Sequence, residues 1–93
     1  MSIYQRAIDK FGYAAQTNQA IEECSELITS LLHFKRGKCS QADVITEIAD
    51  VSIMCEQLKI MFGRDSVDRE IESKLTRLES NLSNLPIGII GIE

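Results

Sequence analysis

Hydrophobic residues recur along most of the chain at the three- and four-residue spacing that is typical of amphipathic α-helices. Glycine, proline and short polar stretches interrupt this pattern. The segments between the interruptions predict a short first helix after Ser2 that ends near residues 11–12, a second from about Thr17 to Arg36, a third from Ser40 to about Phe62, and a fourth from Asp65 or Ser66 that ends before Pro86. Because strand-like alternation is absent before the Ile-rich end of the chain, we expect an all-α, four-helix bundle-like domain.

Several predicted helix ends carry residues with a specific capping role. Ser2 is placed to cap the first helix, and Gly37 is placed to end the second. Ser40 and Asp43 have the spacing of an acidic capping box at the start of the third helix. The segment between the second and third helices is short, so we expect these two helices to be antiparallel neighbours.

Size and composition place limits on the assembly and on its partners. The 93 residues, of which 44% are hydrophobic and 26% charged, predict one domain that spans residues 1–93. A chain of this size buries a small core, so we expect a homo-oligomer, a dimer or a tetramer, in which residues 84–93 form an irregular or short extended tail that packs against another subunit. The net charge of −4 gives no general attraction to nucleic acid or to an anionic membrane. The sequence shows neither a signal segment nor a long apolar run, and we expect a cytoplasmic protein.

The cysteines argue against a disulfide framework and against a zinc site. Cys24, Cys39 and Cys55 are odd in number and have no C-x-x-C spacing. We therefore expect buried free thiols at these positions.

Two carboxylates interrupt the most apolar helix, at Glu47 and Asp50 in the stretch EIADVSIM. At about 100° per residue, Val51 and Met54 fall within about 40° of Glu47, and Asp50 lies about 60° from it, so both acids occupy the apolar sector of the helix. An ionised carboxylate in such a place costs several kcal/mol unless it is paired or bound to a metal ion. A cation is therefore expected beside this acidic pair.

The second helix carries a matching acidic pair, Glu23 and Glu26, at the edge of its own apolar arc. If the two helices are antiparallel neighbours, the two pairs can meet as a cluster of four carboxylates. Oxygen ligands at this density suit Mg²⁺ or Mn²⁺. Two other interpretations stay open: each pair could belong to a solvated helix face, or a lysine or arginine from a neighbouring helix could pair with the acids.

The two acidic pairs, separated by 20 residues and set in the flanks AIEECSEL and EIADVSIMCEQLKI, resemble the MazG-like all-α nucleoside triphosphate pyrophosphohydrolases. The chain is especially similar to the short single-domain members found in bacteria and their phages. The resemblance covers most of the chain, from about Tyr4 to Leu78, and includes the FG at residues 11–12, the KRGK turn and the KLTRL of the fourth helix. It implies Mg²⁺-dependent hydrolysis of a nucleoside triphosphate to the monophosphate and pyrophosphate, between helices of an oligomeric bundle.

The resemblance also implies roles for individual residues. The metal ligands would be Glu23, Glu26, Glu47 and Asp50, with Glu23 or Glu26 as the candidate that orients the attacking water instead. The candidates that bind the triphosphate or other parts of the substrate are Lys74, Arg77, Arg36, Lys38 and Gln16. Helix capping explains Arg36 almost as well, and Gln16 either contacts substrate or has no role.

A second class of function is compatible with the same residues. The chain could be a non-catalytic helical oligomerisation or regulatory module, in which the acidic cluster holds a structural ion or a basic partner. The Ile-rich tail NLPIGIIGIE departs from the family pattern, in which the basic fourth helix simply ends.

Overall fold

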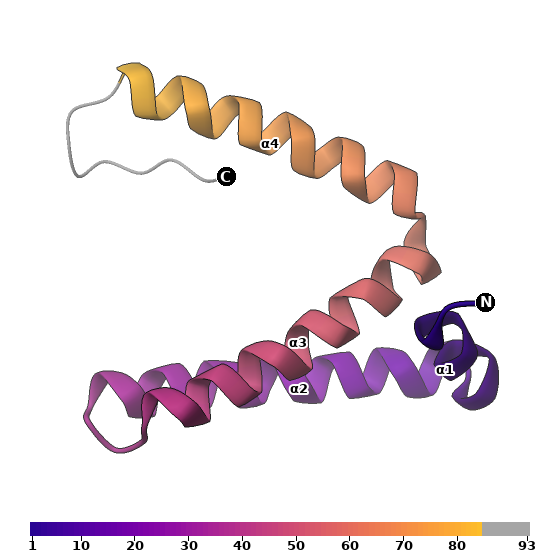
Figure 1. Ribbon diagram of the computed structural model, residues 1–93, viewed down its shortest axis with the longest axis horizontal. Coiled ribbons are helices and arrows are strands. Elements are labelled where there is room, and N and C mark those ends of the chain that lie inside the picture. Colours follow the sequence, from indigo (N-terminus) through magenta and orange to yellow (C-terminus); the bar gives the residue numbers. More distant parts are fainter. Residues whose placement is uncertain (85–93) are drawn as a thin grey trace. The chain divides into compact units, whose positions relative to one another are not determined.

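A computed structural model of the chain describes residues 1–84, and these residues form four α-helices (Figure 1). The helices are α1 (Ile3–Phe11), α2 (Tyr13–Lys35), α3 (Gln41–Phe62) and α4 (Arg64–Asn84). The prediction of an all-α chain is confirmed, because residues 1–84 contain no strand. Among the described helices, none is both long enough and apolar enough to cross a lipid bilayer. The predicted C-terminal tail lies outside the described residues, apart from Asn84 at the end of α4.

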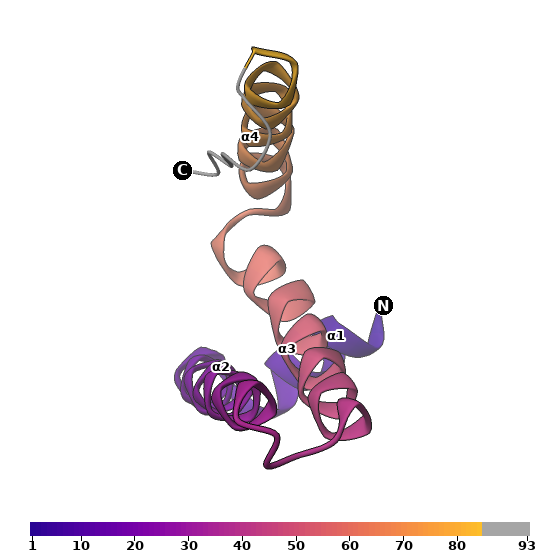
Figure 2. The same cartoon turned by 90° about the vertical axis from the view of Figure 1, so that its left-hand side faces the viewer.

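The chain divides into two compact units. The first, Met1–Met61, contains α1, α2 and nearly all of α3, and the second begins at Phe62 and contains α4. In the first unit, α2 and α3 run side by side and are joined by a short turn, as both views show (Figures 1 and 2). This α2–α3 hairpin carries both acidic pairs.

The helix ends confirm the predicted caps. At the start of α1, the Ser2 hydroxyl accepts a hydrogen bond from the Gln5 backbone N–H at 3.1 Å. At the start of α3, the Asp43 backbone N–H donates to the Ser40 hydroxyl at 3.2 Å, and the Ser40 backbone N–H donates back to the Asp43 carboxylate at 2.9 Å. This reciprocal pair is a capping box, with aspartate in the position that glutamate or glutamine usually takes.

The turn between α2 and α3 depends on Gly37. Its backbone φ of 69° lies in the left-handed region, which a residue without a side chain adopts at little cost. The Lys38 N–H donates to the His33 carbonyl at 2.8 Å, and the Gly37 N–H donates to the Phe34 carbonyl at 3.0 Å. These two bonds make a Schellman motif, which satisfies the last carbonyls of α2 and lets the chain reverse direction.

The start of α2 differs from the prediction. The helix begins at Tyr13, four residues before the expected Thr17. Gly12 has a φ of 92°, so one residue is enough to end α1 and begin α2, and its carbonyl already accepts the Gln16 N–H at 3.1 Å. No side chain caps this end, so the sequence contained no capping signal from which the earlier start could be predicted.

The core of the first unit is small. Its buried apolar residues are Ile8, Ala20, Val44 and Met54. A buried hydrogen bond of 2.7 Å, donated by the Gln16 amide to the Gln57 amide oxygen, joins α2 to α3. Many large apolar side chains of the hairpin stay exposed to solvent.

The cysteines correct one expectation. All three are free thiols, but Cys24 and Cys55 are exposed, and Cys39 is only partly buried. The prediction of buried thiols is wrong because both exposed cysteines lie on sides of α2 and α3 that no other described residue covers.

Candidate metal centre

The pairing of α2 with α3 brings glutamates from both helices together. One carboxylate oxygen from each of Glu23, Glu26 and Glu47 can be chosen so that all three lie within 4.8 Å of one another. The hydrogen bond between Gln16 and Gln57 and the contact between Glu26 and Glu47 fit one register of α2 against α3. Glu26 lies ten residues after Gln16 on α2, and Glu47 lies ten residues before Gln57 on α3. This is the relation between antiparallel helices, and it places the two acidic pairs opposite each other.

Asp50 joins this cluster through Glu23. It is not one of the three residues whose oxygens lie within 4.8 Å, but it lies close enough to raise the pKa of Glu23 through a side-chain hydrogen bond and through its negative charge. The four acids predicted as metal ligands therefore lie in one carboxylate cluster, made of Glu23, Glu26, Glu47 and Asp50.

Crowding of like charges changes the acidity of two members of the cluster. Partial removal from water raises the pKa of Glu23, and the hydrogen bond and negative charge of Asp50, with the charges of Glu26 and Glu47, raise it further. The pKa of Glu47 is raised by partial removal from water and by the charges of Glu26, Asp50 and Asp43. Both groups are therefore harder to ionise in the folded protein than in water.

One oxygen of the cluster has no hydrogen-bond partner within residues 1–84. The Oε2 atom of Glu47 is buried and makes no hydrogen bond. Glu23, in contrast, has a hydrogen-bond partner, because the Gln19 amide donates to its Oε1 atom at 3.2 Å. No lysine or arginine forms an ion pair with the cluster among residues 1–84, so the alternative of a basic side chain that neutralises it finds no support there. The buried Glu47 oxygen and the set of carboxylate donors fit a hard divalent cation.

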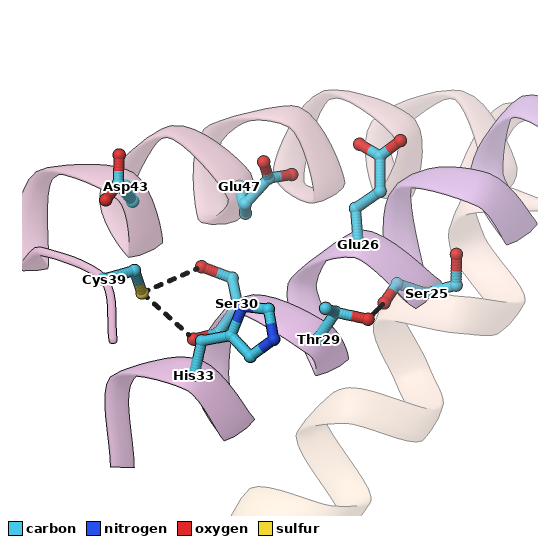
Figure 3. Close-up of a pocket in the computed structure, with 8 residues that line it drawn as sticks. All are labelled: Ser25, Glu26, Thr29, Ser30, His33, Cys39, Asp43 and Glu47. Carbon is cyan, nitrogen blue, oxygen red and sulfur yellow. Dashed lines mark hydrogen bonds between the residues drawn. The ribbon is translucent and has the colours of Figure 1, made fainter. Parts of the chain in front are cut away.

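A groove of about 400 Å³ extends from the carboxylate cluster along the hairpin (Figure 3). Glu26 and Glu47 line it near the cluster, and the remaining lining residues are Ser25, Thr29, Ser30, His33, Cys39 and Asp43. His33 is exposed and lines the groove, a place that the sequence analysis did not foresee. The sequence does indicate this position, because Glu26, Thr29 and His33 are spaced by three and four residues and therefore lie on one face of α2.

Polar contacts hold the far part of the groove in place. The Cys39 thiol donates to the Ser30 carbonyl at 3.4 Å, which ties the turn to α2 (Figure 3). The Ser40 backbone N–H and hydroxyl both donate to Asp43, and these bonds lower the pKa of Asp43. Asp43 is therefore a fixed negative charge in the groove, unlike Glu47.

Gln16, a candidate for substrate contact, is 8% exposed and donates its amide to Gln57. It also lines a second groove of about 350 Å³ with Phe11, Ala15 and Gln19. Gln16 thus has a structural partner, and its contact with substrate stays a prediction.

The candidate basic residues lie in two other places. Arg36 and Lys38 are exposed in the turn after α2, and the ten residues from Glu26 to Arg36 correspond to about 15 Å along a helix. Lys74 and Arg77 are exposed on α4, three residues apart on one side of that helix. The first unit therefore supplies the carboxylates, and α4 of the second unit carries the other basic pair.

The chain was compared with models of protein families, with curated proteins and with solved structures. None of them matches it. The resemblance to MazG-like pyrophosphohydrolases therefore stays a prediction from the spacing and flanks of the two acidic pairs.

Proposed function

We propose that the protein is a Mg²⁺-dependent nucleoside triphosphate pyrophosphohydrolase of the MazG-like type. It would hydrolyse a ribo- or deoxyribonucleoside triphosphate to the monophosphate and pyrophosphate. The observation that supports this most directly is the meeting of four carboxylates from two helices, one with a buried oxygen that no group among the described residues satisfies. Acids are rarely placed in this way unless they bind something positive.

The carboxylate cluster would hold the metal. Glu47 would contribute its buried Oε2, and Glu23, Glu26 and Asp50 would complete a set of hard oxygen ligands that suits Mg²⁺, with Mn²⁺ as a substitute. A bound divalent ion neutralises triphosphate charge and lowers the pKa of a water molecule bound to it. Binding would also lower the raised pKa values of Glu23 and Glu47 by favouring their ionised forms, because only ionised carboxylates are good ligands.

Glu23 or Glu26 would accept the proton of the attacking water. A base works best when its pKa lies near the working pH, and the pKa of Glu23 is raised toward that range. The Gln19 amide holds one oxygen of Glu23 at 3.2 Å, which would fix the orientation of the carboxylate while it accepts a proton. Glu26 is exposed and lines the groove, so it is the alternative base.

Basic side chains would bind the phosphates. Lys74 and Arg77 of α4 could contact phosphate oxygens, and the guanidinium of Arg77 can form a two-point contact. Arg36 and Lys38, at the end of α2, are the second pair of candidates. The groove beside the cluster has a volume of about 400 Å³, within the range of small-molecule sites.

For location and assembly we keep the predictions made from the sequence. We expect a cytoplasmic homo-oligomer, a dimer or a tetramer, in which helices of different subunits complete a bundle. The substrate would be a free nucleotide, because a chain with a net charge of −4 does not attract a nucleic acid polymer.

A helical oligomerisation or regulatory module is the second candidate. The observation in its favour is the number of large apolar side chains that the hairpin leaves exposed, including Ile21, Ile28 and Ile45. In this case the carboxylate cluster would hold a structural ion or a basic partner.

Two measurements test the proposal. Pyrophosphate release from a panel of canonical and deoxy triphosphates, with and without Mg²⁺, should show metal-dependent turnover of at least one of them. Thermal melts should show stabilisation that needs Mg²⁺ and a non-hydrolysable triphosphate together. Stabilisation by the metal alone, with no pyrophosphate release from any triphosphate, would favour the module and refute the enzyme.

A further inference from the structure

The smaller of the two grooves lies on the side of the carboxylate cluster away from the α2–α3 turn. It has a volume of about 350 Å³ and is lined by Phe11 at the end of α1 and by Ala15, Gln16 and Gln19 of α2. None of these four residues carries a charge, so we call it the uncharged groove. The larger groove differs in this respect, because three of its lining residues are carboxylates.

Gln19 joins the uncharged groove to the carboxylate cluster. Its amide donates a hydrogen bond to Glu23 at 3.2 Å. Along the axis of α2, Gln19 lies about 6 Å before Glu23, and Gln16 lies about 10 Å before it. A ligand with one end at the carboxylate cluster therefore needs only a short spacer to place its other end in the uncharged groove.

Gln16 offers an unused hydrogen-bond acceptor in this groove. Its side chain is deeply buried, with 8% exposed, and its Nε2 donates to Gln57 at 2.7 Å. Its Oε1 accepts no hydrogen bond from residues 1–84, and it is not closed off from solvent as the Oε2 of Glu47 is. Because Gln16 lines the uncharged groove, a donor group on a ligand there can reach this oxygen.

Gln19 presents the same group in the same way. Its Nε2 is engaged with Glu23, and its Oε1 accepts no hydrogen bond from residues 1–84. The two glutamines are three residues apart, so they lie on one face of α2. Both amide nitrogens are therefore held by neighbours within the chain, and both amide oxygens are left to accept hydrogen bonds in the groove.

Phe11 gives the uncharged groove an aromatic wall. Its ring is 61% exposed, although it is one of the largest apolar side chains of the first unit. Gly12, with a φ of 92°, lets α2 begin directly after Phe11, which brings the ring beside the two glutamines. An exposed ring in a groove can stack on a planar aromatic ligand, and every nucleobase has such a face.

We propose that the uncharged groove binds the base of the nucleotide substrate, with Phe11 stacked on the base and with Gln16 and Gln19 accepting hydrogen bonds from its exocyclic amino group. The inference rests on the proposed function, which places the phosphates at the carboxylate cluster and leaves the ribose to span the distance between the two sites. Amide oxygens accept hydrogen bonds and do not donate them. Cytosine or adenine therefore fits, whereas uracil or thymine would bring a carbonyl oxygen against the same acceptors.

The larger groove suits a base less well. A base that covered its carboxylates would remove them from water, which costs free energy, and no such cost arises where the lining is uncharged. The uncharged groove also supplies the aromatic ring and the amide oxygens on adjoining segments of the first unit.

Binding is measured with nucleosides, so that neither metal nor hydrolysis is needed. In an NMR titration of the isotopically labelled full chain, cytidine should shift the side-chain amide signals of Gln16 and Gln19 and the ring signals of Phe11. Uridine, which carries a carbonyl oxygen in place of the amino group, should bind at least about tenfold more weakly. No shift at these residues up to the solubility of cytidine, shifts centred on His33 in the larger groove, or equal affinities for the two nucleosides would overturn the proposal.

Phe11 and Tyr13 provide a matched pair of variants. Their rings are 61% and 57% exposed, and of the two only Phe11 lines the uncharged groove. Phe11→Ala should weaken cytidine binding by about tenfold or more through loss of stacking, and Tyr13→Ala should bind cytidine as wild type does. Gln19→Met removes an acceptor from a side chain of similar length and should reduce the preference for cytidine over uridine. With helix content checked by circular dichroism, wild-type affinity in Phe11→Ala, or an equal loss in both alanine variants, would contradict the proposal.

These measurements separate the binding site from the activity. If cytidine binds as described and no triphosphate is hydrolysed, the base site is supported and the pyrophosphohydrolase is refuted. If Phe11→Ala and wild type hydrolyse cytidine and uridine triphosphates with the same kcat/KM, the pyrophosphohydrolase is supported and the base site is refuted.

Discussion

Two groups of polar side chains lie where α2 meets α3, and only one of them has all of its buried side-chain oxygens and nitrogens hydrogen-bonded among residues 1–84. The Gln16 amide donates to Gln57 at 2.7 Å, and the Gln57 amide donates to the Met54 sulfur at 3.7 Å. Both glutamines are buried and neutral. Seven to ten residues further along α2, the carboxylate cluster brings four acids together, and the buried Oε2 of Glu47 has no partner in the part of the chain that the structure describes.

The difference separates a structural polar contact from a candidate binding site. The glutamine pair is complete within the chain, so its role is to join the helices. The carboxylate cluster is incomplete, because partial removal from water and repulsion raise the pKa of two members, and no lysine or arginine in residues 1–84 pairs with them. Substitutions should therefore act in opposite ways: loss of a glutamine partner should cost stability, and loss of a carboxylate should cost activity.

The largest effect should come from Asp50→Asn. The amide keeps the shape of the side chain but removes a negative ligand, so pyrophosphate release should fall by about a thousand-fold, the upper range for one lost electrostatic contact in a transition state. The metal-free variant should be as stable as wild type or more stable, because one member of a like-charge group is removed. Steady-state kinetics at saturating Mg²⁺ and urea unfolding measure the two effects.

Glu56→Gln is the matched control for Asp50→Asn. Glu56 lies on the same helix outside the cluster and pairs with Lys59 at 3.7 Å, so its loss should change neither turnover nor the response to Mg²⁺. Full turnover by Asp50→Asn at ordinary Mg²⁺ concentrations would remove the basis for treating the cluster as a metal centre.

The carboxylate cluster contains no basic residue, so the contacts to phosphate would come from side chains outside it. If Lys74 and Arg77 hold the triphosphate, each alanine variant should lower kcat/KM by about ten- to a hundred-fold, equal to the loss of one charge-assisted contact. Arg77→Lys should restore only part of the loss, because an ammonium group cannot make the two-point contact. Metal binding, measured by calorimetry, should be unchanged in both alanine variants.

Wild-type kinetics in Lys74→Ala and Arg77→Ala would contradict this assignment. The phosphate contacts would then have to come from Arg36 and Lys38 or from another subunit. Double substitution of Arg36 and Lys38 by alanine, assayed in the same way, distinguishes these two possibilities.

The glutamine pair should respond in stability. Gln57→Ala leaves the Gln16 amide buried without its acceptor and should lower the free energy of unfolding by about 2 kcal/mol. Replacement of both glutamines by leucine should recover most of this loss, because both partners are exchanged for apolar groups of similar size. Urea unfolding measures both, and a double variant no more stable than Gln57→Ala would show that the pair is more than a local contact. The activity of the double variant also tests whether Gln16 contacts substrate.

Much of the hairpin could be predicted from the sequence because local chemistry determines it. Glycine at position 37 and the Ser40–Asp43 spacing have one clear structural meaning, and both ends formed as expected. Placing Glu47 and Asp50 in an apolar sector was enough to predict that they face another helix. The early start of α2 was missed because Gly12 acts through its backbone alone, with no side-chain cap to indicate it.

Features that depend on the meeting of distant residues were harder to predict. The pairing of Gln16 with Gln57, 41 residues apart, requires the register of α2 against α3, which no single helix reveals. The cysteines were expected to be buried because their helices are apolar, but the periodicity of one helix does not show which of its apolar sides is covered. Exposure of Cys24 beside Ile21 and Ile28 became visible only once the two helices were paired.

The smallest effect should be the pH dependence of stability without metal. Because Glu23 and Glu47 have raised pKa values, the folded state holds their protons more tightly than the unfolded state does. Their contribution to stability is fully present below the ordinary glutamate pKa of 4.5 and is lost as the pH rises through the raised values. Asp43 has the opposite sign, since its lowered pKa gives stability that is lost only as the pH falls below the ordinary aspartate range.

Glu23→Gln isolates this effect. At low pH the protonated glutamate resembles glutamine, so the Tm of the variant should equal that of wild type. As the pH rises above 4.5, wild type gains like-charge repulsion that the variant lacks, and the variant should become the more stable protein by a few degrees or less. Addition of Mg²⁺ at neutral pH should reverse the order, because the ion stabilises the ionised cluster of wild type more than that of the variant. A difference in Tm that stays constant from acidic to neutral pH, or that Mg²⁺ leaves unchanged, would mean that Glu23 neither repels its neighbours nor binds the ion, and the cluster would then be no different in kind from the glutamine pair.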